Sequence, residues 1–108
     1  GKPIAALQGL QWYISDMAAK IECAKWMIFR AAWLKVSGQP YSKEAAIAKL
    51  NASETATFVT NLALQIHGGY GYMKDYPLER MYRDAKITEI YEGTSEIHKV
   101  VISRAVLK

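Results

Sequence analysis

A heptad repeat of apolar residues runs through residues 7–31, LQGLQWYISDMAAKIECAKWMIFRA. Its two series alternate three and four residues apart, as the core-facing a and d positions of a helix bundle do. The pattern predicts one helix from about Ile4 to Val36, roughly 50 Å long at 1.5 Å per residue, with only Gly9 interrupting it. The two series are Leu7, Ile14, Ile21, Ile28 and Leu10, Met17, Ala24, Ala31.

The residues that follow predict a second long helix. The run SGQP at residues 37–40 ends the first helix, because Gly suits a helix C-terminus and Pro lies just beyond it. Ser42 is the predicted N-cap of the second helix, which is expected from about Lys43 to Ile66. Its many alanines allow close helix approach, and the paired glycines Gly68 and Gly69 end it.

Shorter elements are predicted for the rest of the chain. Residues 70–76 are expected to form a loop, and Pro77 is expected to open a short helix that ends near residue 82 or 85. Residues 87–93 stay unassigned, and Thr94 or Ser95 caps a last helix over about residues 96–107. We therefore predict an all-α, up-and-down four-helix-bundle-like domain with two long helices and shorter C-terminal helices.

Composition indicates a globular chain and excludes several other classes. The 108 residues are 51% hydrophobic and 22% charged, so a disordered chain is excluded. The net charge of +4 is small and scattered, so no nucleic-acid partner is expected. No apolar run is long enough to span a membrane. The single Cys23 lies in the helical apolar pattern, which predicts a small core residue.

One segment departs from simple helical patterning: residues 65–96, QIHGGYGYMKDYPLERMYRDAKITEIYEGTSE. Near its end Glu92 precedes Gly93 and Thr94, where the last helix is expected to begin. This order places a carboxylate in irregular backbone beside the free N–H groups of a helix start, an arrangement that suits a functional site. From the spacing alone, a solvated loop carboxylate is the alternative interpretation.

Several motifs along the chain closely resemble one known family. They are GKPI at residues 1–4 with Gln8, KEAA at 43–46, Arg80, RDAK at 83–86 and IYEGTSEI at 90–97. Together they resemble the C-terminal helical domain of acyl-CoA dehydrogenases over essentially the whole chain. The resemblance implies that residues 1–108 form this domain, without the N-terminal helical and middle β-domains of the family. The start at Gly1, with no initiating Met, is expected of a fragment or a processed product.

The resemblance implies an FAD-dependent dehydrogenase that acts on a fatty acyl-CoA thioester. In the family a glutamate takes the α-proton while the β-hydrogen leaves as hydride to the flavin, and this glutamate falls on Glu92. Tyr91 and Gly93 match positions beside the substrate. Thr94 and Glu96 match positions that contact the FAD of the same active site. A plain N-cap is the alternative interpretation of Thr94.

A second group of residues is implied to contact the FAD bound to a neighbouring subunit. Its members are Gln8, Gln65, Ile66, His67, Gly68 and Gly69. For the paired glycines a helix stop is the alternative, and both roles are compatible, since glycine lets the backbone approach a cofactor closely. The family also implies a homo-oligomer, a dimer or tetramer, and electron-transfer flavoprotein as electron acceptor. His67 and His98 lack metal-ligand spacing, so no metal site is expected.

Two other functions stay open. The chain could be a non-catalytic helical oligomerisation module, or a domain of an acyl-CoA oxidase, which shares the proton abstraction but passes electrons to oxygen. The fragment alone is expected to be inactive, because the middle domain of the family supplies much of the flavin and CoA site. The family implies a cytoplasmic protein in bacteria and a mitochondrial matrix protein in eukaryotes.

Two surface features are also predicted. The apolar second helix and three tryptophans partly off the first heptad seam, Trp12, Trp26 and Trp33, predict self-association. Arg80, Arg83 and Asp84 are expected to form an intersubunit or intradomain ion-pair network.

Overall fold

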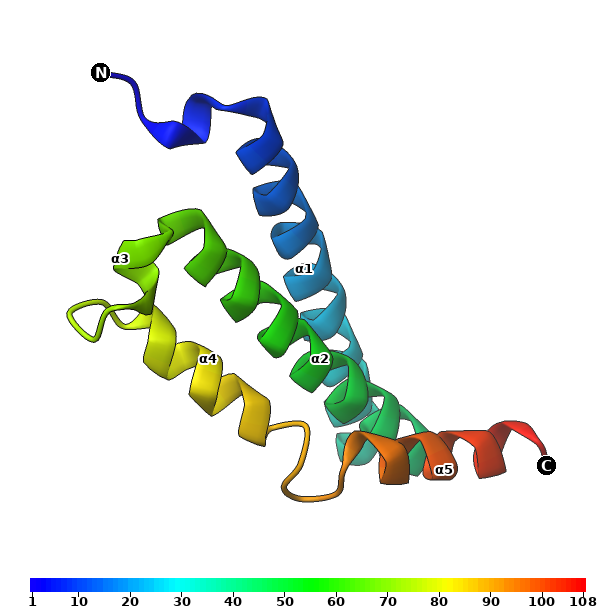
Figure 1. Ribbon diagram of the computed structural model, residues 1–108. Helices are drawn as coiled ribbons and strands as arrows, with labels where there is room; N and C mark the ends of the chain where they lie inside the picture. The colour runs from blue at the N-terminus through cyan, green and yellow to red at the C-terminus, as the bar shows by residue number, and fades with distance from the viewer.

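The computed structural model describes all of residues 1–108 and contains helices but no strand (Figure 1). A short 3-10 helix, Ile4–Ala6, precedes the long helices α1 (Gln8–Val36) and α2 (Ser42–His67). Three shorter helices follow, α3 (Gly69–Tyr72), α4 (Leu78–Ile87) and α5 (Ser95–Val106). The predicted all-α fold with two long helices and shorter C-terminal helices is confirmed. None of the helices combines the length and hydropathy that crossing a bilayer requires.

Helices α1 and α2 form an antiparallel hairpin, because the chain reverses direction within the short turn after Val36 (Figure 1). Gly38 adopts a φ of +69°, the left-handed conformation that favours glycine after a helix. Its N–H donates to the Lys35 carbonyl at 3.2 Å, and the Gln39 N–H donates to the Leu34 carbonyl at 3.0 Å. The last carbonyls of α1 are thereby satisfied, as the Gly-Pro stop signal predicts.

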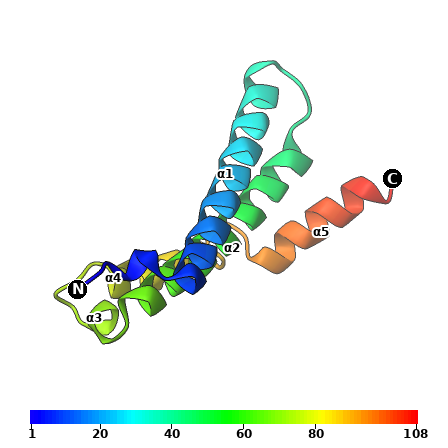
Figure 2. The ribbon, with the colours of Figure 1, turned by 90° about the horizontal axis from the view of Figure 1, so that it is seen from above.

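Helix α2 is the centre of the domain. Helices α1, α3, α4 and α5 each pack on α2, whereas α1, α4 and α5 do not pack against one another. Figure 2 shows α5 leading away from the α1–α2 hairpin toward the C-terminus. The radius of gyration is 16.7 Å, compared with about 13 Å for a compact chain of this length. The elongated shape leaves wide faces of the outer helices uncovered.

The core is thin and consists of small side chains. Only nine of the 108 residues are buried, and no large side chain is fully buried. On α1 the heptad positions Ala24 and Ala31 are buried, but the heptad isoleucines Ile14, Ile21 and Ile28 are 42–47% exposed. The heptad pattern therefore predicted the helix correctly. The larger apolar side chains of the heptad nevertheless stay partly exposed, because the other helices of the chain do not cover them.

Helix starts differ from the sequence predictions in three places. The predicted first helix is interrupted at Leu7, whose extended backbone (φ −81°, ψ 121°) separates Ile4–Ala6 from α1. Tyr41 is the N-cap of α2 instead of Ser42, because the Tyr41 carbonyl accepts the first helical hydrogen bond, from the Ala45 N–H at 2.8 Å. Pro77 is the N-cap of α4 and not its first residue, since its carbonyl accepts from the Met81 N–H.

The predicted loop at residues 70–76 contains the helical turn α3. The turn fits against the end of α2 because Gly71 is buried there and has no side chain. A Cβ on Gly71 would lie 2.7 Å from the Leu64 carbonyl oxygen. Helix α4 also runs further than predicted, to Ile87.

One prediction about an individual side chain is wrong, and another is not fulfilled by contacts within the chain. Cys23 is exposed and not part of the core. Within the chain no ion pair joins Arg80, Arg83 and Asp84, so the intradomain network is absent and the intersubunit one stays a prediction. Arg83 instead pairs with Glu79, one helical turn earlier on α4, at 3.0 Å.

Candidate active site

The chain between α4 and α5, residues 88–94, is a loop closed by backbone hydrogen bonds. The N–H groups of Ile90 and Tyr91 both donate to the Ile87 carbonyl at 3.0 Å, which continues the end of α4 as a tight turn. The Ser95 N–H then donates across the loop to the Glu89 carbonyl, also at 3.0 Å. Glu92 lies in the middle of this closed loop.

Glu92 is the one residue other than glycine that has a positive φ, +53°. Gly93 follows with a φ of +98°. For an L-residue with a side chain the left-handed conformation costs about 1–2 kcal/mol, so it persists only where the surroundings hold it. The Glu92 side chain is exposed. The glutamate that the sequence singles out is therefore also the residue with the strained backbone.

Helix α2 holds the loop through Lys49. The Lys49 Nζ donates to the Gly93 carbonyl oxygen at 2.6 Å, and the bond is partly buried. Hydrogen bonds from a charged donor are shorter and stronger than neutral ones. One turn along α2, the buried Ser53 turns its hydroxyl back to the Lys49 carbonyl at 2.9 Å. The small Ser53 side chain thus leaves room for the loop to lie close to α2.

Helix α5 holds the loop from a second direction through His98. A Cβ on Gly93 would lie 3.0 Å from the His98 Nε2 and 3.4 Å from its Cε1. The His98 Nε2 is buried and has no hydrogen-bond partner in the chain. Glycine is therefore favoured at position 93 for two reasons, its positive φ and the close approach of the imidazole.

Thr94 and Glu96 build the first turn of α5. Thr94 is the N-cap, and its hydroxyl oxygen accepts from the Ile97 N–H at 3.3 Å. The pKa of the Glu96 carboxyl is lowered, first by a hydrogen bond from its own backbone N–H and then by the Thr94 hydroxyl. The N-cap interpretation of Thr94 is confirmed. Contact of either residue with a flavin stays a prediction.

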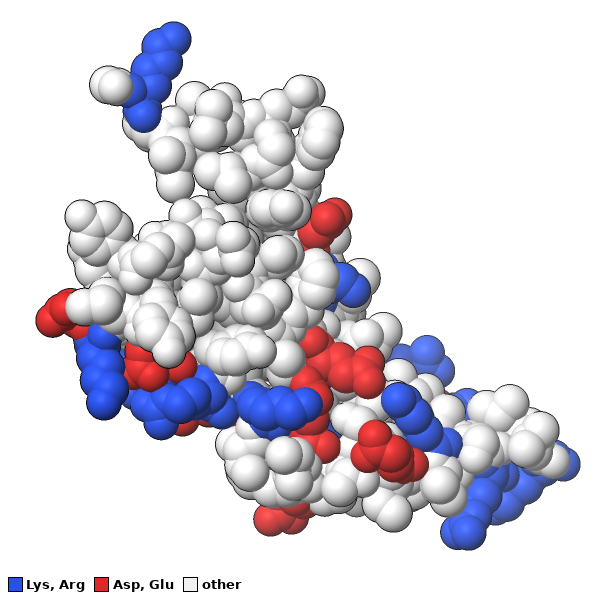
Figure 3. Space-filling model, in the orientation of Figure 1, with Lys and Arg blue, Asp and Glu red and all other residues white.

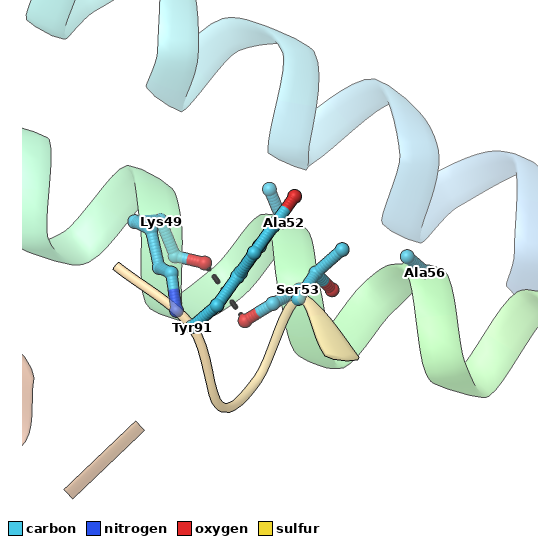
Figure 4. A pocket seen from close by; sticks show the side chains of 6 residues that line it. Lys49, Ala52, Ser53, Ala56 and Tyr91 are labelled. Carbon is cyan, nitrogen blue, oxygen red and sulfur yellow. Dashed lines mark hydrogen bonds between the residues drawn. The ribbon is translucent and has the colours of Figure 1, made fainter. Parts of the chain in front are cut away.

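Tyr91 lies along an open, mostly apolar groove on α2, with a volume of about 240 Å³. Figure 4 shows the Tyr91 side chain extending from the loop across α2 toward Ala52, with Lys49 and Ser53 beside it. The small residues of α2 make room for the ring. The groove is lined by Lys49, Ala52, Ser53, Ala56, Thr88 and Tyr91.

The residues predicted to contact a neighbour's FAD lie at the other end of α2. His67 follows Lys49 by about 18 residues on the same helix, which corresponds to about 27 Å. The structure therefore does not bring this group together with Glu92 (Figure 1). It does bring the N-terminal segment to the same end of α2, where Ile4 lines a pocket of about 230 Å³ with Ile66 and His67. Gln8 begins α1 close by in the chain.

Gly68 and Gly69 expose bare backbone at this end of α2. No atom of the chain lies within 4 Å of a Cβ built on either residue. Gly68 also needs to be glycine for its φ of +58°. The neighbouring His67 is engaged within the helix, since its Nδ1 lies 2.9 Å from the Ala63 carbonyl. Open glycine backbone fits the close approach of a flat cofactor such as a flavin nucleotide.

Sequence reasoning missed Lys49 as part of this site. Lys49 precedes Gly93 by 44 residues. The only signal in the sequence is a lysine on the alanine-rich face of a helix predicted to be packed on several sides. Elsewhere in the molecule, no group of three or more His, Cys, Asp and Glu side chains is arranged to hold a metal ion.

Comparison with known proteins identifies the family of the chain. Residues 1–107 match the family model of the acyl-CoA dehydrogenase C-terminal domain. The chain is 74% identical, over its full length, to 27% of acryloyl-CoA reductase (NADH) from Anaerotignum propionicum. It is 54% identical over its full length to 26% of the mitochondrial short-chain specific acyl-CoA dehydrogenase of Bos taurus.

Solved structures show the same fold. The butyryl-CoA dehydrogenase of Megasphaera elsdenii superposes with a TM-score of 0.98 at 46% identity, over 100% of this chain and 28% of that one. An FAD complex of PigA superposes with a TM-score of 0.94 at 31% identity, over 98% of this chain and 28% of that one.

The fold and the loop define an all-helical domain with a strained glutamate at the start of its last helix. The chain belongs to the acyl-CoA dehydrogenase family, a family of flavoproteins, as its C-terminal domain. It spans about a quarter of the length of the relatives it matches.

Proposed function

We propose that this chain is the domain that carries the catalytic base of an FAD-dependent acyl-CoA dehydrogenase, and that Glu92 is this base. Its carboxylate would remove the α-proton of a fatty acyl-CoA thioester in an α,β-dehydrogenation. The observation that carries the proposal is the +53° φ of Glu92, an unfavourable conformation that the loop nevertheless adopts. Strain of this kind clusters at functional sites.

The second requirement of the reaction is stabilisation of the enolate oxygen that develops as the proton leaves. A C–H beside a thioester is weakly acidic, so the base and the oxyanion donors must both be in place. The Glu92 N–H donates to no group within the chain. It is therefore available to the thioester oxygen beside its own carboxylate. Because both groups belong to Glu92, the conformation that fixes this residue positions the base and the oxyanion donor together.

The bound flavin would accept the β-hydrogen as hydride. Thr94 and Glu96 would face this flavin from the start of α5. Gln8, Gln65, Ile66, His67, Gly68 and Gly69 would instead face the FAD of a neighbouring subunit. Lys49, which holds the loop before Thr94, and His67 of the second group lie about 27 Å apart along α2, which supports two separate cofactor molecules and hence a homodimer or homotetramer.

The names of the relatives favour a short acyl chain as substrate. They refer to acryloyl-CoA, butyryl-CoA and short-chain acyl-CoA. We propose a short-chain acyl-CoA thioester in contact with Tyr91 and Gly93, and electron-transfer flavoprotein as the partner that accepts the electrons. In the reductive direction that the 74% identical relative is named for, Glu92 would return a proton to the α-carbon by microscopic reversibility.

Residues outside this chain are needed for activity. The candidate site on the chain is an exposed loop and an open groove, with no enclosed cavity around Glu92. We expect the 108-residue chain alone to be inactive, with the N-terminal helical and middle β-domains supplying the other walls. The parent enzyme would be cytoplasmic in a bacterium and in the mitochondrial matrix in a eukaryote.

The test replaces Glu92 in the full-length parent enzyme. Glu92→Gln keeps the size of the side chain but removes the proton acceptor. Loss of a general base costs about 10²- to 10⁴-fold in rate, so anaerobic stopped-flow bleaching of the flavin by butyryl-CoA should slow by that factor. Glu54→Gln, on an exposed face of α2, is the matched control and should react at the parent rate. Flavin reduction by Glu92→Gln at the parent rate would refute the assignment.

One observation also favours the second candidate, a helical oligomerisation module. The domain exposes all three tryptophans and most of its large apolar side chains. This property and catalysis are compatible, and the Glu92→Gln experiment separates them, because a purely structural module would tolerate the substitution. Oxygen consumption during turnover distinguishes an acyl-CoA oxidase from a dehydrogenase.

A further inference from the structure

We propose that Lys49 of α2 is a positioning residue for the catalytic loop, which holds Glu92 in its reactive conformation through the Gly93 carbonyl. The inference rests on the proposed function, because it concerns the same base. It assigns a role in the site to a residue on a different helix, 44 positions before Gly93 in the chain.

The Lys49–Gly93 contact is specific. The Gly93 carbonyl accepts no backbone hydrogen bond, and its one partner is the Lys49 Nζ at 2.6 Å. Fixing a lysine side chain costs up to about 2 kcal/mol of rotamer entropy, so lysines ordinarily stay mobile in solvent. Lys49 is instead only partly exposed, and its stem lines the grooves on both sides of it along α2.

The electrostatic surroundings keep the ammonium group in this place. Besides the Gly93 carbonyl dipole, the negative charge of Glu89, at the start of the same loop, attracts the ammonium group. The pKa of Glu89 is lowered, chiefly by its hydrogen bond from Lys86 and to a smaller degree by the positive charge of Lys49. Lys49 thus interacts with two residues of the closed loop, Glu89 through its charge and Gly93 through a hydrogen bond.

The position of the bond explains how it acts on Glu92. Gly93 follows Glu92 directly, and its Cα is confined on the other side by the His98 imidazole. Lys49 holds the Gly93–Thr94 peptide unit and His98 lies against Gly93, so both restrain the residue that directly follows Glu92. Glu92 itself has a positive φ that costs about 1–2 kcal/mol. Without Lys49 the loop can relax, and a displacement of about 1 Å at a reacting group can cost about 10²-fold in rate.

The experiment uses the full-length enzyme and three variants. Lys49→Met keeps the apolar stem but removes the donor. Flavin reduction by butyryl-CoA should slow about 10- to 100-fold, while the dissociation constant of butyryl-CoA and the melting temperature stay close to those of the parent. Lys49→Arg retains a cationic donor and should recover part of the rate. Lys43→Met, near the start of the same helix, is the matched control and should not change the rate.

A double variant shows whether Lys49 acts through Glu92. In the Glu92→Gln background, Lys49→Met should cause no further loss, because the base it positions is already absent. A further loss of the same size, or a Lys49→Met enzyme that reduces flavin at the parent rate, would overturn the inference. If Lys49→Met lowers the melting temperature as well, the Lys49→Arg variant decides: a folded enzyme that is no faster than Lys49→Met contradicts the positioning role.

The two proposals fail in distinguishable ways. A slow Glu92→Gln enzyme beside a fully active Lys49→Met enzyme refutes only the role of Lys49. A fully active Glu92→Gln enzyme refutes the base assignment, and with it the role given to Lys49.

Discussion

The His98 imidazole occupies the space beside Gly93 in which any other residue would need to place its Cβ, 3.0 Å from its Nε2. The packing of α5 therefore favours glycine next to the candidate base. Since Gly93 also has a φ of +98°, neither a shift of His98 nor a local rotation alone would accommodate a side chain.

We predict that Gly93→Ala destabilises the domain by about 1–3 kcal/mol, the cost of a left-handed alanine plus displacement of the imidazole. Thermal unfolding followed by circular dichroism measures the change. Gly9→Ala in α1 is the matched control. Gly9 has an ordinary φ and open space around it, so alanine should stabilise the helix by about 0.5–1 kcal/mol. Equal effects of both substitutions would contradict the packing argument.

A similar pair of substitutions tests the turn at α3. Gly71→Ala would place a Cβ 2.7 Å from the backbone carbonyl of Leu64 and 2.9 Å from the His67 Cβ. Backbone cannot move aside as a flexible side chain can, so we expect a loss of roughly 1–3 kcal/mol, as for other overpacked sites.

Gly69→Ala is the counterpart, with open space around the new methyl group. It should leave the melting temperature nearly unchanged. In the parent enzyme it should lower the affinity for FAD, because Gly69 is proposed to face the neighbour's cofactor. Unchanged FAD affinity, measured by fluorescence titration of the apoenzyme, would argue against that contact.

The stability of the domain should fall in acid. Five glutamates have a lowered pKa: Glu22, Glu44, Glu79, Glu89 and Glu96. For three of them the main cause is a hydrogen bond from a basic side chain. Lys25 donates to Glu22, Arg83 to Glu79 and Lys86 to Glu89. For Glu44 and Glu96 the main cause is the residue's own backbone N–H.

A group whose pKa is lower in the folded state stabilises the fold above its unfolded pKa, about 4.3 for glutamate, and this contribution is lost as the pH falls through the folded pKa. We therefore expect these glutamates to cause no change in the free energy of unfolding between about pH 6 and 7. Below about pH 4 the free energy of unfolding should decrease steadily. Urea titrations at several pH values measure it. Added salt should reduce the contribution of the ion pairs, because their basic partners are exposed.

The 108-residue chain should self-associate. Trp12, Trp26 and Trp33 lie along α1 and are 61–64% exposed. Figure 3 shows that charged side chains gather along α4 and α5, while the area over the N-terminal half of α1 and the far end of α2 is largely uncharged. Exposed large apolar side chains in this number are typical of an interface.

Sedimentation velocity at micromolar concentration should give a species larger than a monomer. Trp26→Ser, on the exposed side of α1, should shift the distribution toward monomer. Lys25→Ser is the matched control, next to Trp26 on α1 and already half exposed. A sharp monomer peak for the unsubstituted chain would show that the exposed surface does not drive association.

Local signals in the sequence determined most of the helical pattern. Apolar residues three and four apart require a helix of 3.6 residues per turn to share one face, so α1 and α2 follow from spacing alone. Gly38, Gly68 and Gly93 mark chain reversals for a similarly local reason, because their positive φ values favour glycine. The order Glu-Gly-Thr before α5 likewise made Glu92 a candidate without any knowledge of the fold.

Long-range contacts decided what the sequence could not. Spacing predicted that the heptad isoleucines face a partner, but only the tertiary structure shows that the domain is too elongated to supply one. The strain at Glu92 is likewise maintained from outside the loop, by Lys49 on α2 and His98 on α5. Such contacts depend on how whole helices pack against each other. The residue pattern of one segment does not indicate which side chain from a distant part of the sequence will contact that segment.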